Sequence, residues 1–422
     1  MKIKNRLNKR TLNNINSLLA YTRNNSQYFK NLYKNSPKNI VSVDDFLKLP
    51  LISKKDLSEI PLKNRLCCTF QEVREIHYSS GTTASPMVTA YTEYDLKKSR
   101  EYLSATWKMQ GAGNPGTKFA MLASYGLFSA GLINHYAIQF AGGTVIPISS
   151  ANMEKVVSVS GQFKPEIGVA VSSYYLFFLE KLKSMGVNPK EIGFKKLIAG
   201  GETMSEEQRF HLEKEFGAKV YFQYGLAEID TGIAGECCRQ KGMHLLDSYV
   251  YAEIINPETG EVLDYGCEGE LVLSHLYRKA TPLLRYRTGD ITSIIKGNCP
   301  CGRTSIRIAP IKKRIASSLS YKGINIDQDE FQAIISKMKS SYFFNLYIWQ
   351  LRLIIDGAKQ RIQFKVRLNK NYSKEQESQL INKLKTELKS LVGINFDIST
   401  FSDSEFLKIS EGKFKKLDVM KI

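Results

Sequence analysis

A short run of hydroxyl-bearing residues around one glycine could bind phosphate. Residues 78–86 read YSSGTTASP and follow the strand-like segment VREIHY. Backbone N–H groups and hydroxyls gathered in a turn can surround phosphate oxygens, so the phosphates of ATP are the natural ligand. Alone, such a run is more often an ordinary polar loop, and its interpretation depends on the other motifs. The residues that we expect to contact phosphate are Ser79, Ser80, Gly81, Thr82 and Thr83.

Cysteines and one histidine form a second chemical pattern. The CPC sequence at 299–301, with Cys237, Cys238 and His244 upstream, offers thiolates and an imidazole that suit tetrahedral zinc. The alternative is a set of free thiols at a turn, because CPC is tighter than the usual CxxC spacing. The chain has seven cysteines, an odd number spread over a long sequence, which predicts reduced thiols rather than a disulfide framework.

The composition indicates the class of protein that must position these residues. The chain has 422 residues, of which 43% are hydrophobic and 24% are charged. These proportions predict a globular protein with a sizeable core, and the length favours two domains. No apolar stretch approaches the roughly 20 residues that span a bilayer, and the first residues lack the apolar core of a signal peptide. We therefore expect a cytoplasmic protein with no membrane partner.

The net charge allows several partners. A formal charge of +19 would suit a polyanion. Nucleic acid is not favoured, because the lysines are scattered and form only short runs such as 312–314 and 413–416. Attraction to ATP, to the phosphates of coenzyme A or to an acidic carrier protein would also use this charge. A lysine-rich composition with little functional meaning is equally compatible with it.

Hydrophobic periodicity divides the chain into regions of different architecture. Up to about residue 75 it favours amphipathic helices, and over 118–220 strand-like and helical runs alternate, which predicts a mainly parallel sheet with helices on both faces. Short alternating strands over about 247–310 predict an antiparallel β subdomain. We therefore expect an α/β fold in which 1–313 form a large domain, and 314–422 form a small α+β domain.

Several segments resemble one known family. The loop SSGTTASP resembles the phosphate loop of adenylate-forming enzymes, which usually reads SSGTTGKP in the phenylacetate–coenzyme A ligase family. Ala84 and Ser85 depart from that pattern, so the family's lysine contact to phosphate is absent. Residues 124–149 resemble the family's substrate-side segment, and Ala199-Gly200-Gly201-Glu202 resembles its adenine-contacting loop. These motifs occur in the family's order, and the resemblance runs from about residue 75 to the end of the chain.

The resemblance implies roles for individual residues. In YGLAE at 224–228, Tyr224 followed by Gly225 would lie near adenine, and Glu228 would help to hold Mg²⁺, a cation that prefers hard oxygen ligands. In PLLRYRTGD at 282–290, Asp290 would accept hydrogen bonds from both ribose hydroxyls, and the nearby arginines could counter phosphate charge. Arg314 aligns with the arginine at the family's domain hinge.

The tail of the chain contains the residue most expected to act in catalysis. Ser410-Glu411-Gly412-Lys413 resembles the lysine-bearing loop that the family's small domain brings into the active site. An ammonium group at the reacting carboxylate and the α-phosphate would stabilise charge in the transition state. Ile315-Ala316-Ser317 departs from the family's pair of hinge aspartates, which puts in doubt the usual rotation of the small domain.

The resemblance also implies a reaction and two further sites. An organic acid, expected to be aryl or related, would react with MgATP to give an acyl-adenylate, and a thiol would then displace AMP. Coenzyme A is the first candidate for that thiol, a phosphopantetheinyl carrier protein is the second, and a polyanion-binding protein without activity is a distant alternative. A second copy of the chain is a further candidate partner. The acid pocket would comprise Tyr125, Phe128, Ser173, Tyr174 and Gly201, and the zinc ligands would be Cys237, His244, Cys299 and Cys301.

Overall fold

The computed structural model divides into two compact units. It describes residues 7–78, 87–149, 153–315, 318–321, 324–338, 341–356, 359–369, 372–402, 405 and 416–421. The first unit comprises Met1–Ser172 and Leu182–Lys312, and the second comprises Ser173–Lys181 and Lys313–Ile422. The inclusion of Ser173–Lys181 in the second unit has no sequence signal. In the part of the chain that is described, no helix combines the length and apolarity needed to cross a membrane.

A large mixed sheet forms the body of the first unit. Its strand order is β13-β9-β8-β7-β6-β5-β3-β4. The strands from β4 to β7 run parallel, and β8, β9 and β13 extend the sheet in antiparallel fashion. The bounds are β3 Lys118–Met121, β4 Thr144–Ile146, β5 Ile167–Val171, β6 Lys196–Gly200, β7 Lys219–Leu226, β8 Asp230–Glu236, β9 Met243–Leu245 and β13 Arg307–Ile308.

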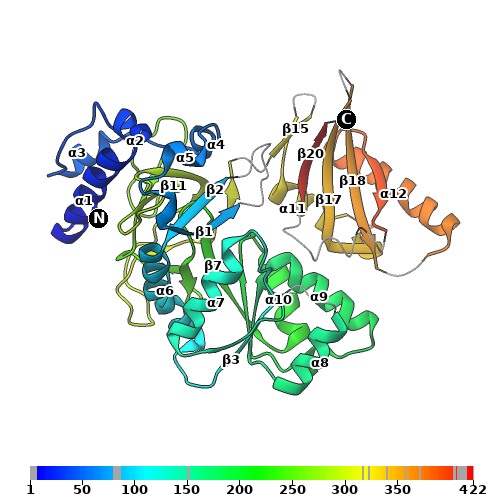
Figure 1. Cartoon of the computed structure of the whole chain (residues 1–422). Helices are drawn as coiled ribbons and strands as arrows, with labels where there is room; N and C mark the ends of the chain where they lie inside the picture. The colour runs from blue at the N-terminus through cyan, green and yellow to red at the C-terminus, as the bar shows by residue number, and fades with distance from the viewer. Residues whose placement is uncertain are drawn as a thin grey trace. The chain divides into compact units, whose positions relative to one another are not determined.

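Helices connect these parallel strands, as the sequence periodicity predicts (Figure 1). The strand IGVAV is apolar at nearly every position because a sheet covered on both faces leaves no side for polar residues. The α/β character expected of this region is therefore confirmed. The connecting helices are α7 Ser129–Ala141, α8 Met153–Phe163, α9 Ser172–Ser184 and α10 Glu206–Phe216, with the 3₁₀ turn η4 Pro189–Ile192.

Short helices begin the chain and attach to the β subdomain. Ile52 pairs with Tyr286 in a parallel bridge, and the backbone N–H of Cys67 donates to the carbonyl of Ala280 at 2.9 Å. In Figure 1 these helices gather beside β1, β2 and β11. The elements are α1 Lys9–Asn25, α2 Gln27–Leu32, α3 Val43–Leu47, α4 Lys54–Ser58, α5 Leu62–Arg65, η2 Phe70–Glu72, β1 Val73–Tyr78, β2 Val88–Thr92, α6 Glu93–Trp107 and the π-helical η3 Lys108–Ala112.

The predicted antiparallel subdomain is present. It contains β10 Val250–Ile255, β11 Gly269–His275 and β12 Tyr286–Thr292. Val250 pairs with His275 at one end of the β10–β11 ladder, and Gly269 pairs with Thr292 in the β11–β12 ladder. This sheet therefore holds the RYRTGD motif, which largely coincides with β12.

The second unit is a small α+β fold. Its main sheet has the order β19-β18-β17-β20, and Phe331, Trp349 and Phe364 lie in its buried core. Leu380, Leu384 and Leu388 line one face of α12, where the spacing of four residues brings them together. The elements are β14 Lys313–Arg314, β15 Ser318–Tyr321, β16 Ile324–Asp327, α11 Gln328–Ser336, η5 Ser341–Phe343, β17 Phe344–Asp356, β18 Lys359–Leu368, α12 Lys374–Val392, β19 Asp397–Thr400 and β20 Leu417–Lys421.

Candidate functional site

Tyr224 and Asp290, which the sequence assigns to the nucleoside end of an ATP site, meet in the structure. Tyr224 lies near the carboxyl end of β7, and Asp290 lies on β12. The Tyr224 hydroxyl donates to Asp290 Oδ2 at 2.7 Å, and both side chains are buried. The hydrogen bond joins the large sheet to the antiparallel sheet. It fixes one carboxylate oxygen beside the tyrosine ring, an arrangement that a bound nucleoside could use.

The turn before Asp290 is held by its neighbours on β11. The backbone N–H of Gly289 donates to Glu270 Oε1 at 3.0 Å, and the Thr288 hydroxyl donates to the carbonyl of Leu271 at 2.7 Å. Gly289 has a φ of 74°, a left-handed conformation in which a side chain is strained. The glycine of RYRTGD is therefore needed for the bend that positions the aspartate.

The arginines of RYRTGD have structural partners. Arg285 is buried, its Nε lies 3.2 Å from Glu253 Oε2, and its Nη1 donates to the carbonyls of Leu47 and Leu49. Arg287 Nε donates to Glu270 Oε2 at 2.9 Å. The expectation that the arginines counter phosphate charge is therefore wrong for Arg285, because its guanidinium fastens the N-terminal helices to the β subdomain.

Glu228 lies in the turn between β7 and β8 and faces a lysine that the sequence did not single out. Lys54 Nζ is 3.5 Å from Glu228 Oε1, and the side chains are 31% and 7% exposed. Two hydrogen bonds hold this turn in place. His275 Nε2 donates to the carbonyl of Ile229 at 3.0 Å, and buried Asp230 accepts from the Tyr249 hydroxyl at 2.9 Å. The chain has many lysines, so the sequence does not indicate that Lys54 is special. Its pairing with Glu228 is found only from the structure.

The glycine-rich loop after β6 lies at the carboxyl edge of the parallel strands. Gly200 ends β6, and Gly201 has a φ of 75°. The Ser172 hydroxyl, at the end of β5, donates to the carbonyl of Glu202 at 3.4 Å. Neighbouring parallel strands therefore bring Gly200, Gly201 and Glu202 to the edge where such sheets bind ligands.

The residues expected to form the acid pocket fall in both units. In the first, the Tyr125 hydroxyl and His135 Nδ1 are 2.9 Å apart, and Phe128 immediately precedes α7. Ser173 and Tyr174 begin the segment of α9 that groups with the second unit, where the Tyr174 ring stacks on Phe178. The assignment of these residues to one pocket stays a prediction.

Several predicted site residues lie outside the part of the chain that the structure describes. Ser79, Ser80, Gly81, Thr82 and Thr83 lie outside the described residues, as does Lys413. The ends of the hydroxyl-rich loop are described, and Tyr78 pairs with Val88 across the β1–β2 ladder. The Tyr78 backbone N–H donates to the carbonyl of Leu127, beside the expected acid-pocket segment, at 2.9 Å. Arg314 lies in β14 and is exposed.

Three cysteines and a histidine converge at one end of the large sheet. The potential ligand atoms of Cys237, His244, Cys299 and Cys301 all lie within 4.8 Å of one another. Cys237 Sγ is 3.7 Å from Cys299 Sγ, and Cys301 Sγ is 3.3 Å from His244 Nε2. In a tetrahedral site with Zn–S bonds of about 2.3 Å, two sulfurs lie roughly 3.8 Å apart, so the cluster fits zinc.

The surroundings of this cluster favour metal ligation. His244 Nδ1 lies 2.9 Å from the Ser305 hydroxyl, which leaves Nε2 directed at the sulfurs. Burial lowers the pKa of His244, which keeps the imidazole in its neutral, metal-binding form. Of the adjacent pair of cysteines, Cys237 is buried in the cluster, whereas Cys238 is exposed. The geometry thus selects Cys237.

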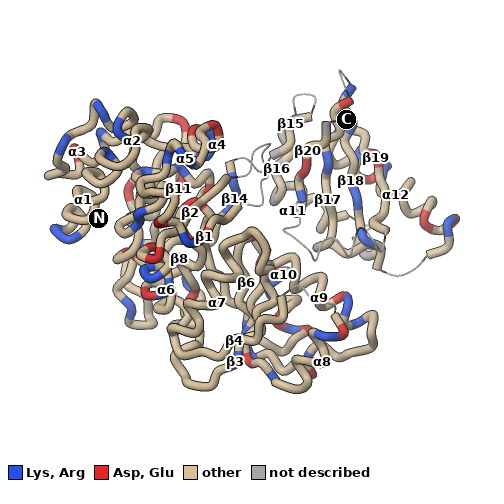
Figure 2. The backbone as a smooth tube through the Cα atoms, in the orientation of Figure 1, with Lys and Arg blue, Asp and Glu red and all other residues tan. Residues whose placement is uncertain are grey.

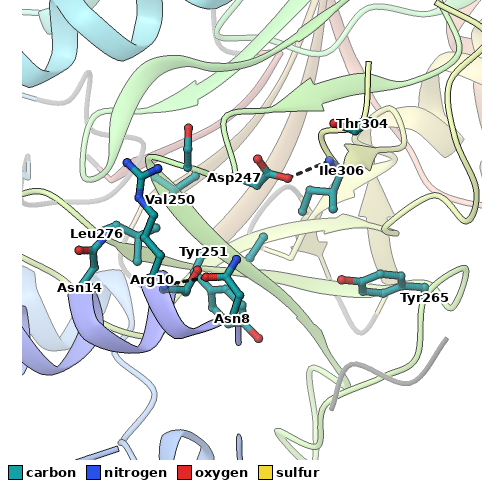
Figure 3. A pocket seen from close by; sticks show the side chains of 13 residues that line it. Asn8, Arg10, Asn14, Asp247, Val250, Tyr251, Tyr265, Leu276, Thr304 and Ile306 are labelled. Atoms are coloured by element: carbon teal, nitrogen blue, oxygen red, sulfur yellow. Dashed lines mark hydrogen bonds between the residues drawn. The ribbon is translucent and has the colours of Figure 1, made fainter. Parts of the chain in front are cut away.

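A separate pocket of about 350 Å³ lies beside the start of α1. Figure 3 shows Asn8, Arg10 and Asn14 from this helix near Asp247 and Ile306, where the Ile306 backbone N–H donates to Asp247 Oδ2 at 3.1 Å. Among the site residues that the structure describes, none lines this pocket. We therefore do not assign it to the nucleotide site.

Comparisons with known proteins identify the family of the chain. The family model described as AMP-binding enzyme matches residues 24–276. The chain belongs to this family. Within the AMP-binding enzymes, it belongs to those that resemble phenylacetate–coenzyme A ligases. The phenylacetate-coenzyme A ligase of Aromatoleum evansii is 30% identical over 387 residues, which cover 90% of this chain and 86% of the relative. That of Thermus thermophilus is 32% identical over 323 residues, which cover 75% and 72%.

Solved structures show that this AMP-binding enzyme has the fold of the adenylate-forming ligases. A 2-hydroxyisobutyryl-CoA ligase in the postadenylation state has a TM-score of 0.76 and 20% identity, and the match covers 92% of this chain and 85% of that chain. The same ligase in the thioesterification state, with CoA bound, has a TM-score of 0.69 and also 20% identity, with 97% and 89% covered. The expected two-domain adenylate-forming fold is therefore confirmed.

Proposed function

We propose that this AMP-binding enzyme is an acid–thiol ligase that activates a carboxylic acid as its acyl-adenylate and transfers the acyl group to coenzyme A. The observation that carries the proposal is the hydrogen bond between Tyr224 and Asp290, which brings together two motifs that lie far apart in the sequence. Membership of the AMP-binding enzymes and the names of the phenylacetate-coenzyme A ligase relatives support this function.

The proposed reaction has two steps. A carboxylate oxygen of the acid attacks the α-phosphorus of ATP, the bond from that phosphorus to the bridging oxygen breaks, and pyrophosphate leaves. The thiolate of coenzyme A then attacks the acyl carbon, and AMP leaves with the former carboxylate oxygen. The first step converts a poor leaving group into a good one, which makes the acid reactive toward a thiol.

The residues of the chain have distinct roles in this proposal. Asp290 accepts hydrogen bonds from the ribose hydroxyls, and Glu228 supplies an oxygen ligand to Mg²⁺, which commonly takes one or two carboxylates together with substrate phosphates. Lys413 stabilises negative charge as the acyl-adenylate forms, and Arg314 contacts the ribose from the hinge. When bound, Mg²⁺ neutralises phosphate charge.

We propose that the Cys237, His244, Cys299 and Cys301 cluster holds a structural Zn²⁺ ion. The four potential ligands lie within 4.8 Å of one another and match the donor set of structural zinc sites. The cluster joins the loop after β8 to the loop before β13, so the ion would stabilise this end of the sheet. The metal has no role in the reaction that we propose.

An acid-library screen for pyrophosphate release tests the reaction and the substrate together. Aryl acids such as phenylacetate are expected to react best, in keeping with the aromatic residues near Tyr125 and with the names of the relatives. Each active acid is then supplied with coenzyme A or with a phosphopantetheinyl carrier protein, and thioester formation is measured. Thioester on the carrier alone would favour the second candidate acceptor. ATP and coenzyme A are both cytoplasmic metabolites, which fits the expected location.

A further inference from the structure

The phosphate end of the proposed ATP site lacks a basic residue of its own. The loop at 79–86 contains only hydroxyl-bearing, small and apolar residues, with no lysine or arginine. A triphosphate carries several negative charges, and an enzyme that binds one usually places lysine or arginine side chains near it. A cation that serves this loop must therefore come from another segment.

Two basic residues of the N-terminal helices lie near Glu228. Lys54 is the first residue of α4, and its Nζ is 3.5 Å from Glu228 Oε1. Arg65 ends α5 and is buried, and burial lowers its pKa, an effect that the Glu228 carboxylate partly opposes. The carboxylate that we assign to Mg²⁺ thus has cations on α4 and α5, which lie far from it in the sequence.

These two cations are held differently. Arg65 donates to the carbonyls of Val88 and Ile60, and it contacts Met87 Sδ at 3.7 Å. Its guanidinium therefore anchors the backbone that follows the hydroxyl-rich loop. Lys54 has a side chain that is 31% exposed and a long, flexible stem, so its ammonium can leave Glu228 for an incoming anion.

The backbone around Lys54 is fixed relative to the nucleoside end of the site. Ile52 accepts from Arg287 and donates to Arg285 through its backbone, at 2.8 and 3.0 Å, which attaches this segment to β12. Ser53 then caps α4 in a reciprocal pair of hydrogen bonds with Asp56. The start of α4 is therefore held by the same strand that carries Asp290.

We propose that Lys54 is a second phosphate-binding cation of this enzyme, in addition to Lys413. In the ligand-free protein it neutralises the buried Glu228 carboxylate, and in the complex with MgATP it contacts the β- or γ-phosphate. Lys54 acts at the phosphate tail, whereas Asp290 and Tyr224 act at the ribose. The inference rests on the proposed use of ATP, and it assigns a task to the N-terminal helices beyond covering the β subdomain.

Equilibrium binding tests the inference with three ligands. MgATP, AMP and adenosine are titrated by calorimetry into the whole protein and into Lys54→Met. Because one charge-assisted contact is lost, the affinity of Lys54→Met for MgATP is expected to fall about 10-fold or more. The affinity for adenosine should stay within about twofold, because adenosine lacks phosphate. Lys54→Arg should retain most of the affinity for MgATP.

Lys55→Met is the matched control, because Lys55 is the next residue of the same helix and its side chain is exposed. It should bind all three ligands as the parent does. If Lys54→Met fails to fold, Lys54→Gln replaces it, since glutamine can still donate a hydrogen bond to Glu228. Equal loss of MgATP and adenosine affinity, or unchanged MgATP affinity, would overturn the role of Lys54. A parent protein that binds no MgATP would instead overturn the proposed function.

Discussion

In the proposed function, nucleotide binding depends most on the carboxylate of Asp290. Two neighbouring ribose hydroxyls can donate to one carboxylate, and Tyr224 already orients that group through its own hydroxyl. The tyrosine and the aspartate therefore contribute unequally. Tyr224 positions the acceptor, whereas Asp290 makes the contacts.

Asp290→Ala is expected to weaken MgATP binding by about 1.5–3 kcal/mol for each charge-assisted hydrogen bond lost. Tyr224→Phe removes only the orienting bond and should cost about 0.5–1.5 kcal/mol. Both affinities are measured by calorimetry on folded protein. An Asp290→Ala variant with the parent's affinity would show that RYRTGD does not bind the ribose.

Lys413→Ala should separate the two half-reactions, because in the proposed function the ammonium is needed only while the acyl-adenylate forms. With acid and MgATP, acyl-adenylate formation is expected to fall about 100-fold or more, the scale of one lost electrostatic contact in the transition state. Supplied with preformed acyl-adenylate and thiol, the variant should form thioester at nearly the parent rate. Equal loss of both half-reactions in folded protein would contradict the assignment.

The loops that carry the cysteine cluster join distant parts of the chain at the end of the large sheet. Cys237 follows β8 and Cys301 precedes β13, and β13 pairs with β9 through Arg307 and His244. A metal that held these loops would stabilise the pairing of two short strands, which has few hydrogen bonds of its own. Replacing one of the cysteine or histidine ligands should therefore lower the thermal stability of the protein.

Cys301→Ser is expected to lower the melting temperature by several degrees and to release zinc, while the ATP affinity of the folded fraction is kept. Cys238→Ser is the control, because Cys238 neighbours Cys237 yet is exposed. Elemental analysis and thermal unfolding are the measurements. Parent protein that contains no zinc, or a variant that loses catalysis at unchanged stability, would count against a structural metal.

The local hydrophobic pattern of the sequence predicts most helices and strands, but it does not predict which of them pack together. The alternation over 118–220 predicts the parallel sheet because buried strands and amphipathic helices have distinct periods. Lys54 could not be found this way, since its proximity to Glu228 depends on how the first helices attach to β12. The grouping of Ser173–Lys181 with the second unit was missed for the same reason. Long-range packing leaves no periodic signal.

At the scale of the whole molecule, the net charge is dispersed. Figure 2 shows lysines and arginines spread along both units, with acidic residues among them. Several basic residues form ion pairs, as Lys195 does with Glu166 at 2.7 Å. A dispersed positive charge attracts small anions from a distance.

Stability should fall in mild acid, because burial lowers the pKa of several histidines. Buried His275 has a pKa of about 3, and the pKa values of His135, His211 and His244 are also lowered. The unfolded chain binds protons near pH 6.5, so this stability is present above that pH and is lost as the pH falls toward 3. For His275 alone, the free energy of unfolding is expected to fall by about 2 kcal/mol between pH 7 and pH 5. Urea unfolding at each pH measures it, and His275→Gln should give a shallower decline.

The order of strands in the large sheet has a consequence for synthesis of the chain on the ribosome. β9 is complete at Leu245, but its neighbour β13 begins only at Arg307, after all of β10, β11 and β12. Until that point the emerging polypeptide carries an open strand edge, the kind of surface that recruits other chains. Nascent chains arrested before Arg307 should therefore depend on chaperones more than chains arrested far enough beyond Ile308 for β13 to have left the ribosome. The antiparallel sheet, whose strands lie between β9 and β13 in the sequence, can form before β13 arrives.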